Sequence, residues 1–221
     1  MRTISIFGDS VSTFEGFNPP GYAVFYDRDM QMRNGLSSVE DTWWYIVLHS
    51  IYASLCANNS YSGSRVSGDS FPSACSDERI DQIRTYDMIP EGVLIYLGYN
   101  DFGYGVDIAI FSDAYSRMIL SLKKTYPHTT IVCGTLLRTC VKEDDQWRFP
   151  EYFAGYPLED YNETIRLTCH EEGVYLADIG KNEERCETLD GAHPTKRGHS
   201  TLAKAWIDCL SELKLIEGLP N

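Results

Sequence analysis

Short, continuous hydrophobic runs recur along the chain and predict five strands. They cover residues 3–7, 54–58, 92–97, 129–134 and 174–177. The third run is apolar throughout, which is typical of a central parallel strand covered on both faces. Each run is short enough for a strand and is bounded by polar residues or glycine.

Between these runs, hydrophobic residues recur at helical spacing. The longest stripe runs from Ile108 to Tyr126, and a closing helix carries Leu202 to Leu213. Ser37-x-x-Glu40 matches a capping box and is expected to begin a helix bearing Trp44. Strands that alternate with helices predict an α/β fold, here a three-layer α/β/α sandwich. We expect a flavodoxin-like, five-stranded parallel sheet of order 2-1-3-4-5, in a single domain spanning residues 1–221.

Composition excludes several classes of partner. The 221 residues suit one domain, and the net charge of -13 argues against binding nucleic acid or an anionic membrane surface. No apolar run approaches the ~20 residues of a membrane helix, and the N-terminus does not resemble a secretory signal. The seven cysteines form no CxxC pair, so no zinc site is expected and a reduced, cytoplasmic location is favoured.

Polar clusters follow four of the predicted strands. Gly8-Asp9-Ser10 ends the first strand, residues 59–63 follow the second, and residues 98–101 follow the third. Residues 190–194 lie beyond the last strand, across a loop. Because ligands bind beyond the carboxyl ends of parallel strands, these clusters are expected to meet at one edge of the sheet.

The residue types in these clusters fit acyl transfer. Ser10 needs a base within hydrogen-bonding reach, and His193 can serve because imidazole titrates near neutral pH. Asp190, three residues earlier, can fix the tautomer of that imidazole. Candidate donors to a developing oxyanion are the backbone N–H groups of Ser10 and Gly63 and the side-chain amide of Asn100.

Each cluster alone has an ordinary structural interpretation. Gly-Asp-Ser is common in turns, and Asn100 could cap a helix. His193 alone could be a surface histidine, and His199 on the closing helix is a weaker candidate base. The convergence of all the clusters on one edge favours catalysis.

With these blocks, the sequence resembles the SGNH hydrolases of the GDSL type, which are named for a Ser, Gly, Asn and His in four separated blocks. The resemblance spans nearly the whole chain and implies Ser10 as nucleophile, His193 as base and Asp190 as its partner. It also implies an oxyanion hole formed by Ser10, Gly63 and Asn100. The matching blocks are Gly8-Asp9-Ser10, Gly63, Gly98-x-Asn100-Asp101 and Asp190-x-x-His193-Pro194.

Some positions depart from the family pattern or leave alternatives open. Val11 replaces the leucine of the name motif, and Tyr99 stands where a small residue is common and is expected to line the site. Gly68 is a rival to Gly63 as the oxyanion glycine. Residues 138–156 are predicted to form an aromatic loop whose Trp147 contacts the substrate; alternatively, the loop packs on the protein or on a second subunit of a homo-oligomer. The loop carries Trp147, Phe149, Tyr152, Phe153 and Tyr156.

We therefore expect a serine ester hydrolase that forms an acyl-enzyme on a small-molecule ester, without a metal or an organic cofactor. The favoured substrate has a short acyl group, such as acetate on a carbohydrate. A thioesterase or lysophospholipase with the same residues is one alternative, and a non-catalytic binding module on the same fold is another. A metal-dependent hydrolase is disfavoured because the edge lacks a set of His and Asp ligands.

Overall fold

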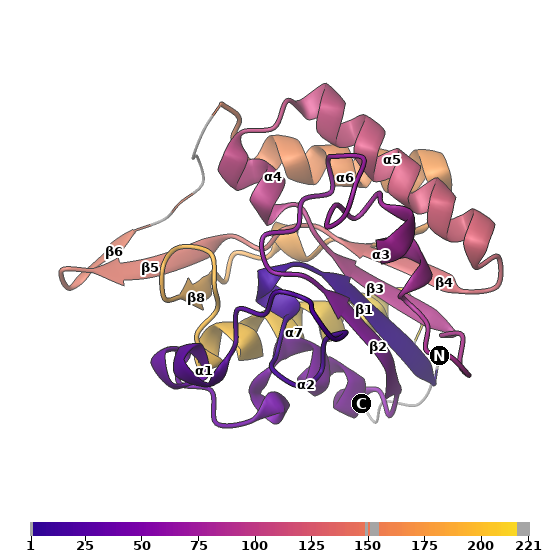
Figure 1. Ribbon diagram of the computed structural model, residues 1–221. Coiled ribbons are helices and arrows are strands. Elements are labelled where there is room, and N and C mark those ends of the chain that lie inside the picture. Colours follow the sequence, from indigo (N-terminus) through magenta and orange to yellow (C-terminus); the bar gives the residue numbers. More distant parts are fainter. Residues whose placement is uncertain (1, 149, 151–154, 216–221) are drawn as a thin grey trace.

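Five parallel strands form the central sheet, in the order β2-β1-β3-β4-β7 (Figure 1). The computed structural model describes residues 2–148, 150 and 155–215. Since β7 is the fifth predicted strand, the predicted order 2-1-3-4-5 is confirmed, and the strand boundaries agree to within two residues. The strands are β1 (Thr3–Gly8), β2 (Ser54–Ser60), β3 (Gly92–Tyr96), β4 (Thr130–Gly134) and β7 (Tyr175–Ala177).

Helices cover both faces of this sheet, as the alternating pattern predicts (Figure 1). On one face, the rings of Trp43 and Trp206 stack at a centroid distance of 5.4 Å and join two of the helices. In the described part of the chain, no helix is long and apolar enough to cross a membrane. One face carries α2 (Trp43–Ser50) and α7 (Lys196–Glu212); the other carries α3 (Asp77–Asp81), α5 (Ile108–Thr125) and α6 (Leu158–Glu172).

The expected cap of α2 is wrong. Thr42, rather than Ser37, caps the helix, and a short 3-10 turn, η2 (Val39–Asp41), comes before it. The carboxylate of Asp41 accepts the N–H and the hydroxyl of Ser37, both at 2.7 Å. Asp41, rather than Glu40, therefore accepts the hydrogen bonds of Ser37, and the predicted capping box does not form.

A second, three-stranded sheet replaces part of the predicted loop. Its order is β6-β5-β8, with β5 and β6 forming a hairpin that projects from the body of the molecule (Figure 1). The two-residue turn Asp144-Asp145 has φ of 47° and 61°, the backbone that hairpin turns favour. Asp-Asp lacks the glycine that usually signals such a turn. The strands are β5 (Thr139–Glu143), β6 (Gln146–Arg148) and β8 (Cys186–Thr188).

Short helices gather at the carboxyl edge of the central sheet. One follows β1 directly, and Asp9 caps it by accepting the N–H of Val11 at 3.0 Å. Another follows β3, so the polar clusters after both strands begin in helical turns. These short elements are η1 (Ser10–Ser12), α1 (Arg28–Asn34), α4 (Tyr99–Tyr104) and η3 (Ile179–Lys181).

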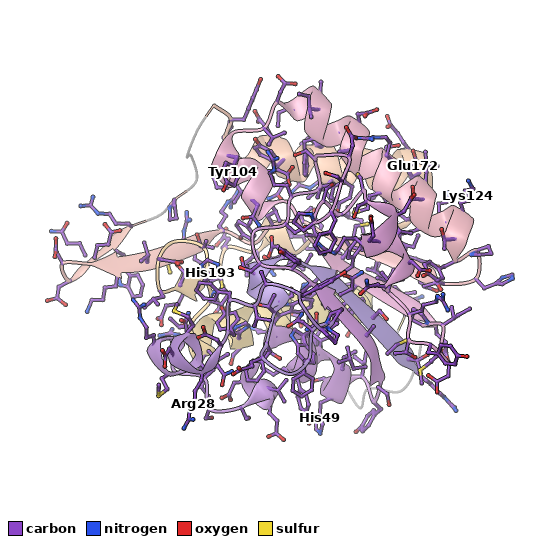
Figure 2. The ribbon with its side chains drawn as sticks, in the orientation of Figure 1. Arg28, His49, Tyr104, Lys124, Glu172 and His193 are labelled. Carbon is purple, nitrogen blue, oxygen red and sulfur yellow. The ribbon has the colours of Figure 1, made fainter. Side chains whose placement is uncertain are left out.

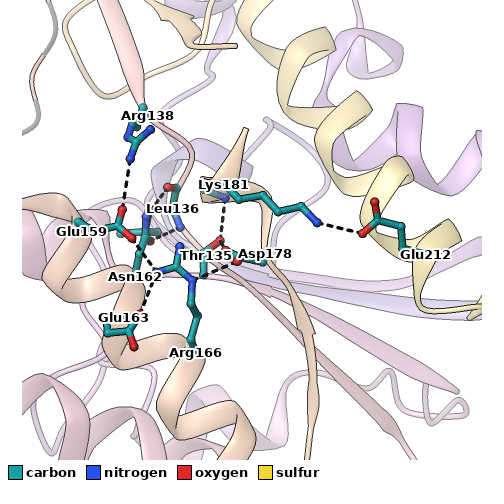
Figure 3. Close-up of polar contacts among 11 residues, drawn as sticks. Thr135, Leu136, Arg138, Glu159, Asn162, Glu163, Arg166, Asp178, Lys181 and Glu212 are labelled. Atoms are coloured by element: carbon teal, nitrogen blue, oxygen red, sulfur yellow. Dashed lines mark hydrogen bonds and ion pairs between the residues drawn. The ribbon is translucent and has the colours of Figure 1, made fainter. Parts of the chain in front are cut away.

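A polar network fixes the chain where it leaves β4 (Figure 3). The side chain of Asn162 accepts the N–H of Leu136 at 2.7 Å and donates to its carbonyl at 3.0 Å. The hydroxyl of Thr135 donates to Asp178 at 2.9 Å, and Arg166 pairs with the same carboxylate at 3.1 Å. These contacts attach the segment after β4 to both α6 and the end of β7.

Arg79, at the centre of α3, joins the ends of the first two strands. Its side chain is fully buried, and all five of its guanidinium N–H groups donate to acceptors. Nε and one terminal nitrogen bind the side chain and carbonyl of Asn59, at 2.9 and 3.1 Å. The other acceptors are the carbonyl of Gly8 at 2.9 Å, the hydroxyl of Ser64 at 2.7 Å and the carbonyl of Pro72 at 2.8 Å.

Burial lowers the pKa of Arg79 to about 10, which still leaves the group charged at neutral pH. We predict that Arg79→Met lowers the free energy of unfolding by about 3–5 kcal/mol, because buried acceptors lose their only charged donor. Urea denaturation measures the change. Arg84→Met is the control: this arginine is 41% exposed in a surface ion pair, so its loss should cost under about 0.5 kcal/mol. Equal effects of the two substitutions would contradict the role given to Arg79.

Candidate active site

Ser10 begins η1 immediately beyond β1, and its hydroxyl faces a histidine. The distance from Ser10 Oγ to His193 Nε2 is 2.9 Å. The close packing beneath Ser10 requires glycine at position 8, since a Cβ there would lie 2.6 Å from Ser12 Oγ and 2.9 Å from Ser60 Oγ. Gly8 thus allows β1 to end tightly against β2 and present Ser10 at the edge.

Asp190 and His193 lie in one tight turn, as their spacing predicts. Asp190 Oδ2 is 2.7 Å from His193 Nδ1, and Oδ1 accepts the backbone N–H of His193 at 2.9 Å and of Ala192 at 3.1 Å. Burial raises the pKa of Asp190, but these hydrogen bonds and the charge of His193 outweigh it and lower the pKa to about 2. Because an ionised carboxylate only accepts, it holds the proton on Nδ1 and leaves Nε2 free to accept from Ser10.

Packing holds the imidazole of His193 in this orientation. The ring of Phe25 stacks on it with centroids 3.4 Å apart and planes within 6°. The carbonyl of His193 accepts the N–H of Leu189 at 2.9 Å and the side-chain amide of Asn34 at 3.3 Å. Phe25 lies in an aromatic-rich segment, and no feature of its sequence distinguishes it from the neighbouring rings.

Asn100 lies in the first turn of α4, beside the serine. Its side-chain amide donates to the carbonyl of Ser64 at 2.9 Å and lies 3.4 Å from Asp9 Oδ2. Burial raises the pKa of Asp9 to about 7. The buried carboxylate of Asp101 accepts the backbone N–H groups of Val66 and Ser67, at 2.7 and 2.9 Å. Both aspartates thus brace the loops that surround Asn100.

Gly63, unlike Gly68, lies in the turn that is hydrogen-bonded to both the end of β1 and Asn100, although both glycines line a cavity next to that of Ser10 rather than the Ser10 cavity itself. It lies in a turn whose Tyr61 N–H donates to the carbonyl of Gly8 at 3.2 Å, and whose Ser64 carbonyl binds Asn100. The turn is therefore attached on one side to the strand of Ser10 and on the other to Asn100. The φ of Gly63 is +80°, a conformation that favours glycine. Gly68 lies beyond the residues that bind Asp101.

A cavity of about 310 Å³ opens over these groups. Ser10, His193 and Asp190 line it together with Asn100. Much of the remaining wall is apolar, formed by Val11, Tyr99, Phe102 and Ala192, with Tyr104 at one side. Figure 2 labels two of the lining residues: Tyr104, the last residue of α4, and His193, in the turn after β8.

Tyr99 lines this cavity, as the sequence predicts, but only through its ring. Its hydroxyl donates to the carbonyl of Leu137, which also ties α4 to the segment after β4. Burial raises the pKa of Tyr99 well above its usual value. Tyr99 therefore forms a wall of the cavity and is no acid or base near neutral pH.

Trp147 does not lie with the other candidate residues. It belongs to β6, is 46% exposed, and lines a separate cavity beside Cys140 and Arg197. The β5–β6 hairpin, which the sequence did not predict, places Trp147 away from Ser10. The prediction that Trp147 contacts a substrate in the cavity at Ser10 is therefore wrong. Phe149, Tyr152 and Phe153 of the same predicted loop lie outside the described residues.

His199, the weaker candidate base, is fully buried in α7. Its Nδ1 accepts the backbone N–H of Trp43 at 3.2 Å. Burial lowers the pKa of His199 to about 3, so the ring stays neutral near neutral pH. His199 packs between α2 and α7, and it is not among the residues that line the cavity at Ser10.

A family model, the GDSL-like lipase/acylhydrolase family, matches residues 2–146. The match includes Ser10, Gly63 and Asn100 but ends before Asp190 and His193. The position of these last two residues beside Ser10 therefore comes from the fold and not from the match. No curated protein matches the sequence.

Solved structures with the same fold cover nearly the whole chain. A Bacteroides ovatus protein described as a GDSL-like lipase has 21% identity and a TM-score of 0.73, with 96% of this chain and 99% of that chain covered. A similarly described protein from Bacteroides uniformis has 24% identity and a TM-score of 0.70, with 96% of each chain covered. A carbohydrate acetylesterase family member from Sinorhizobium meliloti has 15% identity and a TM-score of 0.66, with 96% and 99% covered.

At these identities the solved structures establish the shared fold, and the family model adds the sequence relationship. The predicted resemblance to SGNH hydrolases of the GDSL type is thereby confirmed. Since the model matches well over half of the chain, the protein belongs to the GDSL-like lipase/acylhydrolase family and is a carboxylic ester hydrolase.

Proposed function

We propose that the protein hydrolyses short-chain carboxylic esters through an acyl-enzyme on Ser10. One observation carries this proposal: the unbroken chain from Ser10 Oγ to His193 Nε2 at 2.9 Å, and from His193 Nδ1 to Asp190 Oδ2 at 2.7 Å. Nucleophile, base and orienting carboxylate are all within hydrogen-bonding reach.

In the first half-reaction, His193 takes the proton of Ser10 as Oγ bonds to the ester carbonyl carbon. The carbonyl electron pair moves onto its oxygen and forms a tetrahedral oxyanion. The oxyanion then collapses, the bond to the alcohol oxygen breaks, and His193 donates its proton to that oxygen. Water repeats these steps on the acyl-enzyme, which releases the acid and restores Ser10.

The proposed donors to the oxyanion are the backbone N–H groups of Ser10 and Gly63 and the amide of Asn100. One N–H of Asn100 is engaged by Ser64 at 2.9 Å, whereas its contact with Asp9 is longer, at 3.4 Å. The longer contact is the one that a charged oxyanion can replace. Such preorganised donors stabilise charge in the transition state without further reorganisation.

The cavity supports a short acyl group. Its volume of about 310 Å³ is at the lower end of the range for ligand cavities, and its apolar wall beside Ser10 suits a small hydrocarbon group. A similar structure belongs to a carbohydrate acetylesterase family member. Acetate esters of carbohydrates are therefore the proposed substrates. A thioesterase or lysophospholipase would use the same residues, and substrate series distinguish these activities.

We predict that Ser10→Ala lowers kcat by at least about 10⁴-fold and Asp190→Asn by about 10³- to 10⁴-fold, since each breaks the hydrogen-bonded chain at a different atom. Steady-state hydrolysis of 4-nitrophenyl acetate measures both. Asp160→Asn, an exposed acid in the first turn of α6, is the matched control and should change kcat less than about twofold. Undiminished turnover by Ser10→Ala would exclude Ser10 as nucleophile, and a protein with no turnover at all would point to a binding module.

We predict that kcat/KM for 4-nitrophenyl esters falls at least about tenfold from acetate or butyrate to decanoate, because the long chain exceeds the catalytic cavity and stays in water. Comparison of acetyl and decanoyl esters at equal detergent concentration measures this. A rise with chain length would instead favour a lysophospholipase. A thioester of acetate hydrolysed much faster than its oxygen ester would favour a thioesterase.

A further inference from the structure

A second cavity, of about 420 Å³, lies directly beside the catalytic one. Tyr104 belongs to the walls of both cavities, and Gly63 lines the second. A single ligand can therefore extend from Ser10, past the oxyanion glycine, into this second space. Its far wall comes from Asp69 to Ser73, the segment that follows the Asp101-bound turn.

The second cavity differs from the catalytic one in chemistry. Its walls carry Arg65 and the serines at positions 67, 70 and 73. Two aromatic faces border it: Tyr104 is 72% exposed and Phe71 40% exposed. Exposed aromatic faces beside hydroxyl groups suit a ring that is itself both apolar and hydroxylated. The catalytic cavity, by comparison, has the more apolar wall.

Arg65 places a positive charge on the wall of this cavity, which also carries the carboxylate of Asp69. Its guanidinium carbon lies over the Tyr104 ring, 5.5 Å from the ring centroid, in a cation–π contact. The side chain is exposed, and no carboxylate of the described residues forms an ion pair with it. The nearby carboxylate of Asp69 is instead bound by Arg117, at 2.9 Å. Within the described residues, Arg65 thus places a cation without a carboxylate ion pair on a cavity wall, in a chain whose net charge is -13. The charge of Arg65 also opposes the rise that burial causes in the pKa of Asp101.

We propose that the second cavity binds the alcohol portion of the ester, and that Arg65 selects an anionic group, such as the carboxylate of an acidic sugar, on that portion. This inference rests on the proposed ester hydrolysis at Ser10. The small, apolar catalytic cavity receives the acyl group, and the polar cavity beyond Tyr104 receives the rest. Tyr104 holds the guanidinium at the boundary, where its charge reaches a ligand that spans both cavities.

A matched pair of acetate esters tests this proposal. The probes are 4-acetoxybenzoate and its neutral methyl ester, whose alcohol portions have the same ring and differ in charge. The quantity measured is the ratio of kcat/KM for the anionic ester to that for the neutral ester. Because the two leaving groups differ in intrinsic reactivity, only changes of this ratio between variants are interpreted.

The expected result is a ratio about three- to tenfold lower in Arg65→Ala than in the wild type, the range between exposed ion pairs and charge-assisted hydrogen bonds. Arg65→Glu should lower the ratio further by repulsion. Arg28→Ala, an exposed arginine on α1 away from both cavities (Figure 2), should leave the ratio as in the wild type. Raising the ionic strength should lower the ratio of the wild type but not that of Arg65→Ala.

Two outcomes separate this proposal from the proposed function. If both esters are hydrolysed in a Ser10-dependent way and Arg65→Ala keeps the wild-type ratio, the role of Arg65 is overturned while ester hydrolysis stands. If neither ester is hydrolysed, the proposed function itself fails. An equal drop of the ratio in Arg28→Ala would assign the effect to overall charge and would also overturn the role of Arg65.

Discussion

The buried guanidinium of Arg79 is the contact that joins the end of β1, which leads to Ser10, to the end of β2 and the loop beyond it. Burying a charge is costly, and among the described residues no carboxylate is hydrogen-bonded to this guanidinium; five neutral acceptors bind it instead. Those acceptors belong to Gly8, Asn59, Ser64 and Pro72, which lie at the ends of β1 and β2 and in the loop beyond. The phenyl ring of Phe7, with its centroid 5.0 Å from the guanidinium carbon, adds a cation–π contact.

This contact fixes distances that catalysis needs. Ser10 follows Gly8 by two residues, and Gly63 precedes Ser64 by one, so Arg79 helps to set the spacing between the proposed nucleophile and a proposed donor to the oxyanion. Asn100 then binds the carbonyl of Ser64 and joins the same frame from a third strand. The histidine reaches this frame independently, from the turn after β8, where Asp190 and the stacked ring of Phe25 orient it. The acceptors around Arg79 and the separately oriented base thus meet at Ser10.

The sequence predicted the features that repeat or follow a simple periodicity. Continuous apolar runs located the five strands, and the polar residues after them located Ser10, Asn100 and the Asp190 turn. The sequence could not predict the burial of Arg79. An arginine in a short helix is usually exposed, and the residues that accept its hydrogen bonds are distant in sequence. The β5–β6 hairpin was not predicted because its turn is Asp-Asp, without the glycine that usually signals a hairpin. Trp147 lies in this hairpin, so its position was predicted wrongly as well. Thr42 was missed as a cap because Ser37-x-x-Glu40 matches the capping-box pattern, whereas Thr42 is followed three residues later by Tyr45, which does not.

The central claim is that folding makes one serine, Ser10, nucleophilic. Reaction of the native protein with a fluorophosphonate, followed by mass mapping of the peptides, tests this most directly, since the reagent traps a serine that is activated by its neighbours. The account predicts one adduct, on Ser10, which is lost when the protein is first unfolded in urea and strongly slowed in His193→Ala. No adduct on Ser10 in the folded protein, or the same labelling rate with and without His193, would contradict it.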